Sequence, residues 1–231
     1  MRRALRILGT VLVVGGVLML VWAGVVWRWQ DPFTALYTHW KQGGLATEYE
    51  HRAAAFRPVA AGSLAAERRA IVQEARAYRK ASARGAAIGR IRIARMGLDM
   101  VLVNGTDHDT LREGPGRDLR SFMPGENRLV YVAGHRTTYL APFSHIDRLR
   151  KGDPVTVQVP YATFVYSVTG HRIVVANDLS VLRSPGHEVL ELQACHPRFF
   201  ATHRYIAYAR LVRVEPRGGT PYAPPAEAAG S

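Results

Sequence analysis

Two residues in the C-terminal half of the chain carry side chains that suit acyl transfer. Cys195 is the only cysteine, and it ends the apolar run Leu192-Gln193-Ala194. Arg204 opens the next apolar run, and Pro197 lies in the loop between them. If the two runs pair as antiparallel strands, the thiol and the guanidinium share one end of a sheet. A permanent cation beside a thiol favours the reactive thiolate and can stabilise the oxyanion formed when that thiolate attacks a carbonyl.

A histidine far upstream supplies a third chemical group. His135 follows an apolar strand and lies in a Gly-His-Arg-Thr-Thr-Tyr turn, where a buried structural histidine is not expected. A Cys–His couple provides a nucleophile and a general acid–base. His196 and His203 adjoin the cysteine and the arginine, so in extended backbone each would project to the opposite face. The predicted catalytic residues are therefore His135, Cys195 and Arg204.

The remaining composition narrows the possible ligands. The sequence has none of the residue spacings typical of a zinc site, an EF-hand, a P-loop or a dinucleotide fold, and no cluster of carboxylates that indicates calcium. The formal net charge is +13 and comes mostly from arginine, yet no basic run alternates with aromatic residues. We expect no cofactor, no metal and no nucleic-acid partner. A basic domain held at a membrane would instead be attracted to anionic lipids and wall polymers.

Short segments rich in β-branched and aromatic residues must position these side chains. Turn residues separate them, and short helical inserts are expected near residues 109–112 and 142–149. The eight predicted strands are 91–93, 99–103, 129–132, 155–159, 164–168, 172–175, 189–193 and 205–212. So many short strands in one compact stretch predict an all-β fold, either a barrel or a sandwich.

The N-terminus predicts a membrane anchor. Residues 7–27 form an uncharged stretch of 21 residues, which as a helix spans a bilayer core of about 30 Å. Arg2, Arg3 and Arg6 precede it, which favours a cytoplasmic N-terminus at residues 1–6 and an extracellular C-terminal bulk. A cleaved signal peptide is the competing interpretation. The stretch is longer than a usual signal core, and no clean A-x-A site follows it.

Two further segments flank the expected catalytic domain at residues 86–215. Residues 28–85 are predicted to form a helical juxtamembrane spacer. Within it, Leu64, Ile71, Ala75 and Tyr78 recur at helical spacing, as in a solvated stalk, a helix lying on the domain or, less commonly, a partner-binding helix. Residues 216–231 are rich in Pro, Gly and Ala and are expected to be a disordered tail.

These residues together resemble the sortases, which are wall-associated cysteine transpeptidases, and most of all the class E branch found in actinobacteria. The resemblance runs from about residue 89 to residue 214. Its motifs are Val132-Ala133-Gly134-His135-Arg136-Thr137-Thr138-Tyr139, Ala141-Pro142-Phe143, Leu192-Gln193-Ala194-Cys195-His196-Pro197-Arg198 and Arg204-Tyr205-Ile206-Ala207. It implies an eight-stranded β-barrel, which agrees with the strands read from the sequence.

The same resemblance implies a reaction and its partners. Cys195 would attack the carbonyl between Thr and Gly of an LPXTG- or LAXTG-type sorting signal at the C-terminus of a surface protein. Arg204 would hold the substrate and its oxyanion, and His135 would protonate the leaving amine. A peptidoglycan precursor or another amine would then accept the protein through an amide. The enzyme would be a single-pass protein of the cell membrane.

Two positions depart from the pattern of the resembled family. Sortases usually carry Thr immediately before the cysteine, where this chain has Ala194. Class E members commonly have a Gly-His-Tyr segment upstream, with its Tyr linked to a preference for Ala in LAXTG, whereas this chain has Gly116-Arg117-Asp118. The LAXTG preference is therefore not carried over. We hypothesise that the Asp118 carboxylate favours a polar or cationic group on the substrate, which an ordinary LAXTG preference in a peptide library would refute.

Other functions stay open at this stage. An L,D-transpeptidase would show Ser-His-Gly before its cysteine and arginine two positions after it, and this chain shows neither feature. A papain-like protease would carry its cysteine early in the domain, at a helix start. The non-enzymatic alternative is a membrane-anchored basic module, such as a degenerate sortase, that binds wall polymers or partner proteins.

Overall fold

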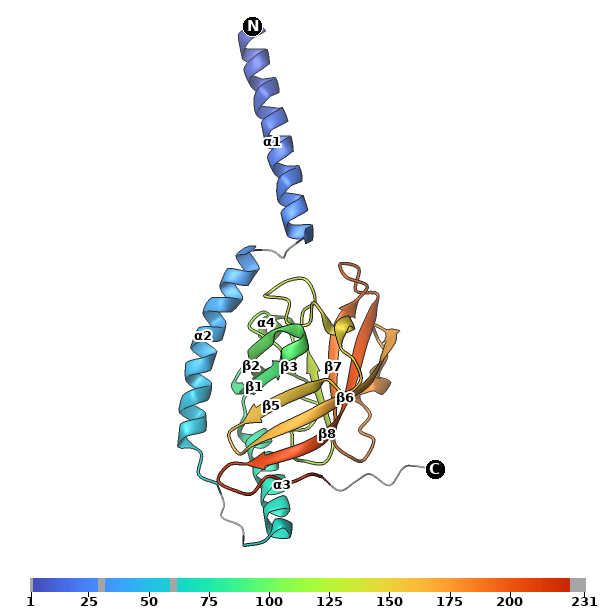
Figure 1. The fold of residues 1–231 in the computed structure, drawn as a ribbon. Helices are drawn as coiled ribbons and strands as arrows, with labels where there is room; N and C mark the ends of the chain where they lie inside the picture. The colour runs from blue at the N-terminus through green and yellow to red at the C-terminus, as the bar shows by residue number, and fades with distance from the viewer. Residues whose placement is uncertain (1, 29–31, 59–61, 225–231) are drawn as a thin grey trace.

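The computed structural model describes residues 2–28, 32–58 and 62–224 (Figure 1). Three helices precede the barrel: α1 (Arg2–Arg28), α2 (Pro32–Ala55) and α3 (Leu64–Ala81). α1 projects away from the body, whereas α2 and α3 lie along it (Figure 1). The part of α1 from Arg2 to Val25 is long and apolar enough to cross a membrane.

The chain after α3 forms a closed β-barrel, which confirms the predicted fold class. Its strands follow the order β1-β2-β3-β4-β7-β8-β6-β5 around the barrel. Short helical segments connect some of them: η1 (Ala94–Met96), α4 (His108–Leu111), η2 (Ile146–Arg148) and η3 (Leu179–Leu182). The strands are β1 (Ala87–Ile93), β2 (Leu98–Asn104), β3 (Gly116–Arg117), β4 (Leu129–Ala133), β5 (Pro154–Val159), β6 (Ala162–Val175), β7 (Val189–His196) and β8 (His203–Pro216).

The strands differ from the prediction in two places. The segments predicted at 164–168 and 172–175 form one continuous strand, β6, which crosses Gly170 through a register shift against β8. A bulge lets a ladder continue past a residue that interrupts the alternating pattern. β3 was not predicted, because two residues are too few to show any periodicity.

The strands that carry the predicted site alternate between the barrel interior and its outer surface. Val132 of β4, together with Leu192 and Ala194 of β7, is buried in the core. Successive side chains of a strand point to opposite faces, so their neighbours point outward. Tyr131 and Gln193 are two such neighbours, and the Tyr131 hydroxyl donates a hydrogen bond to Gln193 Oε1. The outer face of β4 and β7 is therefore the surface on which the site is built.

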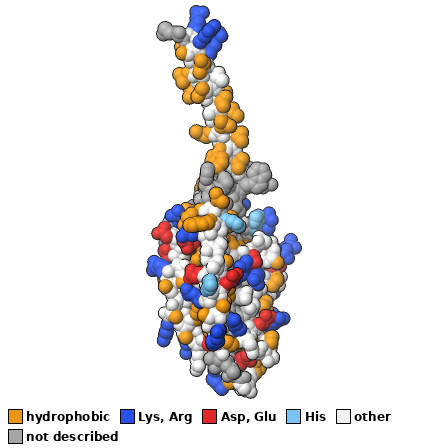
Figure 2. Space-filling view, turned by 90° about the vertical axis from the view of Figure 1, so that its left-hand side faces the viewer, with side chains coloured by type: hydrophobic (Ala, Val, Ile, Leu, Met, Phe, Trp, Pro, Cys, Tyr) orange, Lys and Arg blue, Asp and Glu red, His pale blue; other side chains and the backbone are white. Residues whose placement is uncertain are grey.

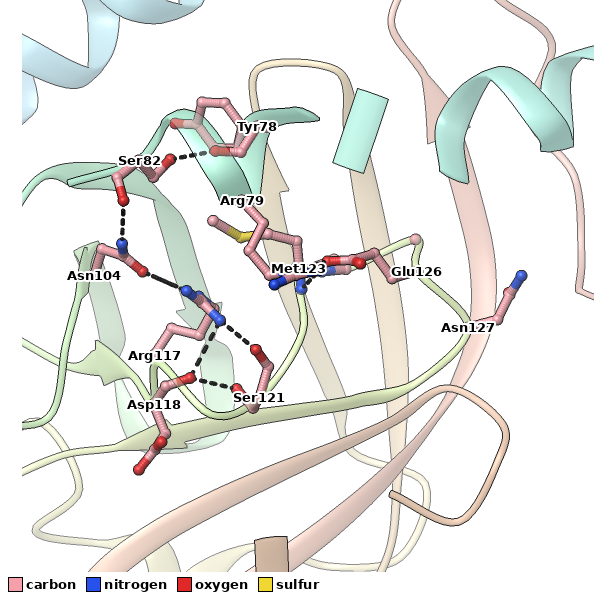
Figure 3. Close-up of polar contacts among 12 residues, drawn as sticks. Tyr78, Arg79, Ser82, Asn104, Arg117, Asp118, Ser121, Met123, Glu126 and Asn127 are labelled. Carbon is pink, nitrogen blue, oxygen red and sulfur yellow. Dashed lines mark hydrogen bonds and ion pairs between the residues drawn. The ribbon is translucent and has the colours of Figure 1, made fainter. Parts of the chain in front are cut away.

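A buried arginine joins α3 to the strands below it (Figure 3). Arg117 is 1% exposed and donates from Nε and Nη2 to Asn104 Oδ1, and from Nη1 to the carbonyls of Asp118 and Ser121. Asn104 Nδ2 in turn donates to the carbonyl of Ser82, the residue that caps α3. Burial lowers the pKa of Arg117 to about 10, so its guanidinium stays charged at neutral pH. The network ties α3, β2 and the turn before β4 into one unit.

The segment predicted as a spacer, residues 28–85, lies largely against the barrel in its described parts. Ile71 and Ala75 on the apolar face of α3 are buried, as expected for a helix lying on the domain. Leu45 and Tyr49 of α2 pack against β1 and β2. Near the start of α2, Thr38 Oγ1 donates to the carbonyl of Arg112 at 2.9 Å. The two helices therefore extend the body of the domain.

The chain after β8 departs from the predicted disordered tail. Tyr222 forms an isolated antiparallel bridge with Val214, and the Arg68 guanidinium lies 5.1 Å from its ring centroid. Arg68 Nη2 also donates to the carbonyl of Ala223 at 3.0 Å. An aromatic ring half-buried against a cation holds this stretch in place, despite a composition rich in Pro and Gly. The rest of the predicted tail, residues 225–231, lies outside the described residues.

Glu188, immediately before β7, makes folding sensitive to pH. Its carboxyl is buried and accepts hydrogen bonds from the Tyr166 hydroxyl and from the backbone N–H groups of Gly125 and Asn127. Burial raises its pKa from 4.5 to about 7. A carboxyl whose pKa is raised on folding contributes stability below its unfolded pKa and loses that contribution as pH rises through its folded pKa.

We therefore expect Glu188 to contribute a fall of about 3 kcal/mol in the free energy of unfolding as the pH rises from about 5 to 8. Glu188→Gln, which stays neutral, should remove this contribution. Denaturant titrations of the detergent-solubilised full chain at each pH measure it. The same pH dependence in wild type and variant would contradict the assignment.

Candidate active site

Cys195 and Arg204 lie opposite each other on β7 and β8. Their Cα atoms are direct partners in the antiparallel ladder. Directly opposed residues lie about 4.5–5.5 Å apart with their side chains on the same face. Cys195 is partly exposed, and its thiol is free. The structure thus confirms that the thiol and the guanidinium share one end of the sheet.

His135 approaches the same end of the sheet from the other side of β7. β4 runs parallel to β7 with Ala133 opposite Gln193, and the Gly134 N–H donates to the Gln193 carbonyl at 3.0 Å. His135 lies two residues beyond Ala133, as Cys195 lies two residues beyond Gln193. His135 thus follows the end of β4 while Cys195 lies near the end of neighbouring β7, so the three predicted residues lie at adjacent ends of three strands.

The imidazole of His135 is packed against an aromatic ring and has one nitrogen unpaired. The Tyr139 ring lies 5.1 Å from it, centroid to centroid. His135 Nε2 is buried and has no hydrogen-bond partner among the described residues. Burial lowers the pKa of His135, and the nearby His108 lowers it further. A buried polar nitrogen without a partner is uncommon and calls for an explanation, and a catalytic role is one.

The loop after β4, from residue 135 to residue 143, explains the sequence around the histidine. The Phe143 N–H donates to the His135 carbonyl at 3.0 Å and closes the turn. A Cβ at Gly134 would lie 2.8 Å from the Phe143 ring, so only glycine fits there. Residues 139–141 have φ angles of 52°, 59° and 39°, a left-handed conformation that costs about 1–3 kcal/mol per residue. This strained turn holds Tyr139 against the imidazole.

Arg204 also organises the loop between β7 and β8. Its Nη1 donates to the carbonyls of Ala201 and His203 at 2.8 and 2.9 Å. A guanidinium has five N–H donors on three nitrogens, so these two bonds leave donors for a substrate oxygen. The arginine is therefore both fixed in place and able to bind an anion.

Arg136 is a site residue to which the sequence assigned no role. It is 5% exposed, and its Nη1 lies 3.3 Å from the Cys195 carbonyl oxygen and 3.0 Å from His196 Nδ1. Its Nη2 pairs with Asp147 at 3.2 Å. The guanidinium thus fastens the backbone of the cysteine to the turn that carries the histidine. Only its position directly after His135 could have pointed to Arg136 in the sequence. Its contact with β7 joins segments far apart in the chain, which a sequence pattern does not reveal.

Ala194 stands where sortases usually have Thr, and its side chain packs in the barrel core and not on the surface that carries the thiol. Ala194 is fully buried in the barrel core, and its partner across β8, Tyr205, is buried there too. The ring of His196 lies 6.3 Å from that of Tyr205, so this histidine projects away from the Cys195 face, as expected. A hydroxyl at position 194 would point into the barrel and would not meet a substrate on the outer face.

The hypothesis that Asp118 recognises a substrate group is not supported by its surroundings. Its carboxylate accepts two hydrogen bonds from the Arg120 guanidinium, one from the Arg120 N–H and one from Thr106 Oγ1. The side chain is 6% exposed. These donors satisfy both carboxylate oxygens, so Asp118 orders its own turn.

Comparison with known proteins places this chain in a family. The model of the sortase domain matches residues 91–212. Sortase D of Bacillus subtilis is 33% identical over 132 residues, which are 55% of this chain and 65% of that protein. Sortase SrtE1 of Streptomyces coelicolor is 33% identical over 110 residues, 43% of this chain and 31% of that protein. The chain thus spans less than two thirds of the length of either relative.

A solved structure shows the same fold. A sortase D5 transpeptidase of Clostridium perfringens superposes with a TM-score of 0.61 over 74% of this chain and 98% of that one, at 23% identity. Because sortase D and sortase E relatives match equally well in identity, the expected class E assignment is not singled out.

Proposed function

The chain belongs to the sortase family, and on this premise we propose that it is a cysteine transpeptidase that joins surface proteins to an amine of the cell wall. Its substrate would be a sorting signal of LPXTG or LAXTG type, cut between Thr and Gly. The acceptor would be an amine of a peptidoglycan precursor. The single observation that supports the proposal is the direct pairing of Cys195 with Arg204 across β7 and β8, with His135 just after the end of neighbouring β4.

The first half of the reaction would form a thioester. The Cys195 thiolate attacks the Thr carbonyl carbon, and the carbonyl oxygen becomes an oxyanion beside the Arg204 guanidinium. The tetrahedral intermediate collapses and breaks the C–N bond to Gly. The departing amine takes a proton from the His135 imidazolium, which leaves the imidazole neutral. The Thr carbonyl is then bonded to the cysteine sulfur.

The second half would transfer the acyl group. The amine of the wall precursor attacks the thioester carbon and gives a proton to neutral His135. The oxyanion forms again beside Arg204, and collapse breaks the C–S bond. The cysteine is released as thiolate, and the new amide joins the protein to the wall component. Atoms and charge balance in both halves. No outside energy source is needed, because the thioester keeps the energy of the broken amide bond and uses it to form the new amide bond.

The direct test is transpeptidation by the full chain, since α2 and α3 pack against the barrel. LPXTG and LAXTG peptides are incubated with the solubilised protein and triglycine, and the joined product is measured by mass. We expect product with at least one peptide. Binding of wall polymers without product, unchanged in Cys195→Ala, would instead favour a non-enzymatic binding module.

Arg204 offers a graded prediction within this reaction. We expect Arg204→Ala to lower kcat/KM for the peptide by about 10²–10³-fold, the usual cost of losing an oxyanion donor. Arg204→Lys should recover only part of this, because lysine lacks the planar fork of donors. Arg210→Ala is the matched control, since this arginine is exposed on the same strand but far from the thiol. Equal losses in both alanine variants would contradict the assigned role.

A further inference from the structure

Large apolar side chains are exposed in the loop that follows the catalytic cysteine. Phe199 and Phe200 are 57% and 77% exposed, four and five residues after Cys195. Leu36 and Trp40 on α2 are each 71% exposed. Aromatic side chains so exposed on a soluble surface mark a place where another molecule, or a membrane, is contacted.

Two independent sets of contacts place these side chains at the same end of the barrel. The first is the β7–β8 loop itself, which begins at the end of β7 beside the thiol. The second is a contact of Tyr37, the residue after Leu36. The ring of Tyr37 lies 6.5 Å from that of Tyr139, which packs against His135. The start of α2 and the β7–β8 loop therefore lie at the end of the domain that carries the site.

Further exposed apolar residues lie at this end. Val175 at the end of β6 is 54% exposed, and its Cα is paired with that of His203 at the start of β8. Leu179 at the start of η3 is 66% exposed. Among the described residues outside α1, fewer large apolar side chains are exposed at the opposite end. Leu64 at the start of α3 is one of them, and it is 48% exposed. The apolar surface is thus polarised toward the site.

The chain connection fixes what this end faces. α1 ends at Arg28 and α2 begins at Pro32, and four residues span at most about 15 Å. Trp40 lies eight residues into α2, about 12 Å along its axis. Figures 1 and 2 show the same arrangement, with α1 leaving from this end and hydrophobic and histidine side chains gathered beside its base. If α1 spans a bilayer, this end is the one nearest to the lipid.

The charges at this end do not oppose contact with lipid headgroups. Arg198 is exposed next to the two phenylalanines. Four carboxylates near this end have a cationic side chain within 4 Å: Asp109 with Arg112, Glu113 with Lys41, Asp147 with Arg136 and Asp178 with Arg172. Aromatic residues flanked by arginine are typical of the bilayer interface, where the ring enters the headgroup layer and the cation meets lipid phosphate.

We propose that Trp40, Phe199 and Phe200 insert into the headgroup layer of the bilayer that holds α1, so that the catalytic end of the barrel lies on the membrane surface. The site would then meet substrates that are themselves held at the membrane, with less freedom to diffuse away. This inference rests on α1 as a membrane anchor and does not depend on the transpeptidase reaction.

The single cysteine makes a direct test possible. In full-length Cys195→Ala protein, one new cysteine at a time is introduced at position 40, 200, 64 or 12 and labelled with a nitroxide. The protein is reconstituted into vesicles of phosphatidylcholine and phosphatidylglycerol. Electron paramagnetic resonance then compares collisions with oxygen, which enters lipid, and with a water-soluble nickel chelate. All four native side chains are exposed, so the labels do not disturb the core.

We expect labels at 40 and 200 to collide several-fold less with nickel than the control at 64, and to favour oxygen as does the label at 12 within α1. Equal nickel access at 40, 64 and 200, with the label at 12 in lipid, would overturn the proposal while leaving the anchor intact. A label at 12 that is fully water-accessible would overturn both. Protection at 200 that appears only when a sorting-signal peptide is added would show that the loop binds peptide and not lipid.

Discussion

Replacing Cys195 with alanine is expected to reduce transpeptidation by on the order of 10⁴-fold or more, because no other group in the site can form the acyl intermediate. The chain has no second cysteine that could substitute for it. The measurement is the rate of joined-product formation from a sorting-signal peptide and triglycine. Cys195 is only partly buried, so the substitution should leave the thermal unfolding transition almost unchanged.

Cys195→Ser is the informative companion variant. A serine hydroxyl has nearly the same shape, but it is far less ionised than a thiol at neutral pH, so its reaction should be almost as slow as that of the alanine variant. Activity within tenfold of wild type in either variant would show that the thiol is not the nucleophile.

The second large effect is expected at His135. His135→Ala should lower kcat/KM by about 10²–10⁴-fold, since a general acid–base contributes that much. Added imidazole should restore part of the rate by occupying the space beside Tyr139. Rescue of this kind would separate a proton-transfer role from a merely structural one. His51→Ala is the matched control, because this histidine is exposed near the C-terminal end of α2, whereas the start of α2 is the end near the site.

The pH dependence should identify the same residue. Burial lowers the pKa of His135 below its ordinary value of 6.5, so the imidazolium that protonates the leaving amine is lost as the pH rises through that lower value. The profile of kcat/KM should therefore contain an ionisation below 6.5 that His135→Ala lacks. An unchanged profile in the variant, or no rescue by imidazole, would assign the proton transfer to another group.

Much of the site could be predicted because its signals are local. Cys195 and Arg204 end and begin two strands joined by a short loop, and antiparallel pairing leaves little choice about where their side chains meet. His135 stands out because a histidine after a buried strand, flanked by glycine, has no obvious structural purpose. The position of Ala194 in the core also follows from the alternation with buried Leu192.

The rest depends on contacts between segments distant in sequence. Arg136 reaches the Cys195 carbonyl across 59 positions, and no periodicity indicates such a bond. The hypothesis for Asp118 came from its position in the sequence, whereas its partners Arg120 and Thr106 are set by the fold. The packing of α2 against the site depends on rings of Tyr37 and Tyr139 that a helical pattern does not connect. The sequence thus predicts which groups react, and the structure shows which contacts hold them.

The most direct test of the central claim is to trap the acyl-enzyme. The full chain is incubated with a sorting-signal peptide without an amine acceptor, and its intact mass is measured together with the modified position after digestion. We predict a mass gain equal to the peptide portion up to and including Thr, located on Cys195 and released by hydroxylamine. Peptide cleavage with no adduct on Cys195, or with the adduct on another residue, would contradict a thioester mechanism at this site.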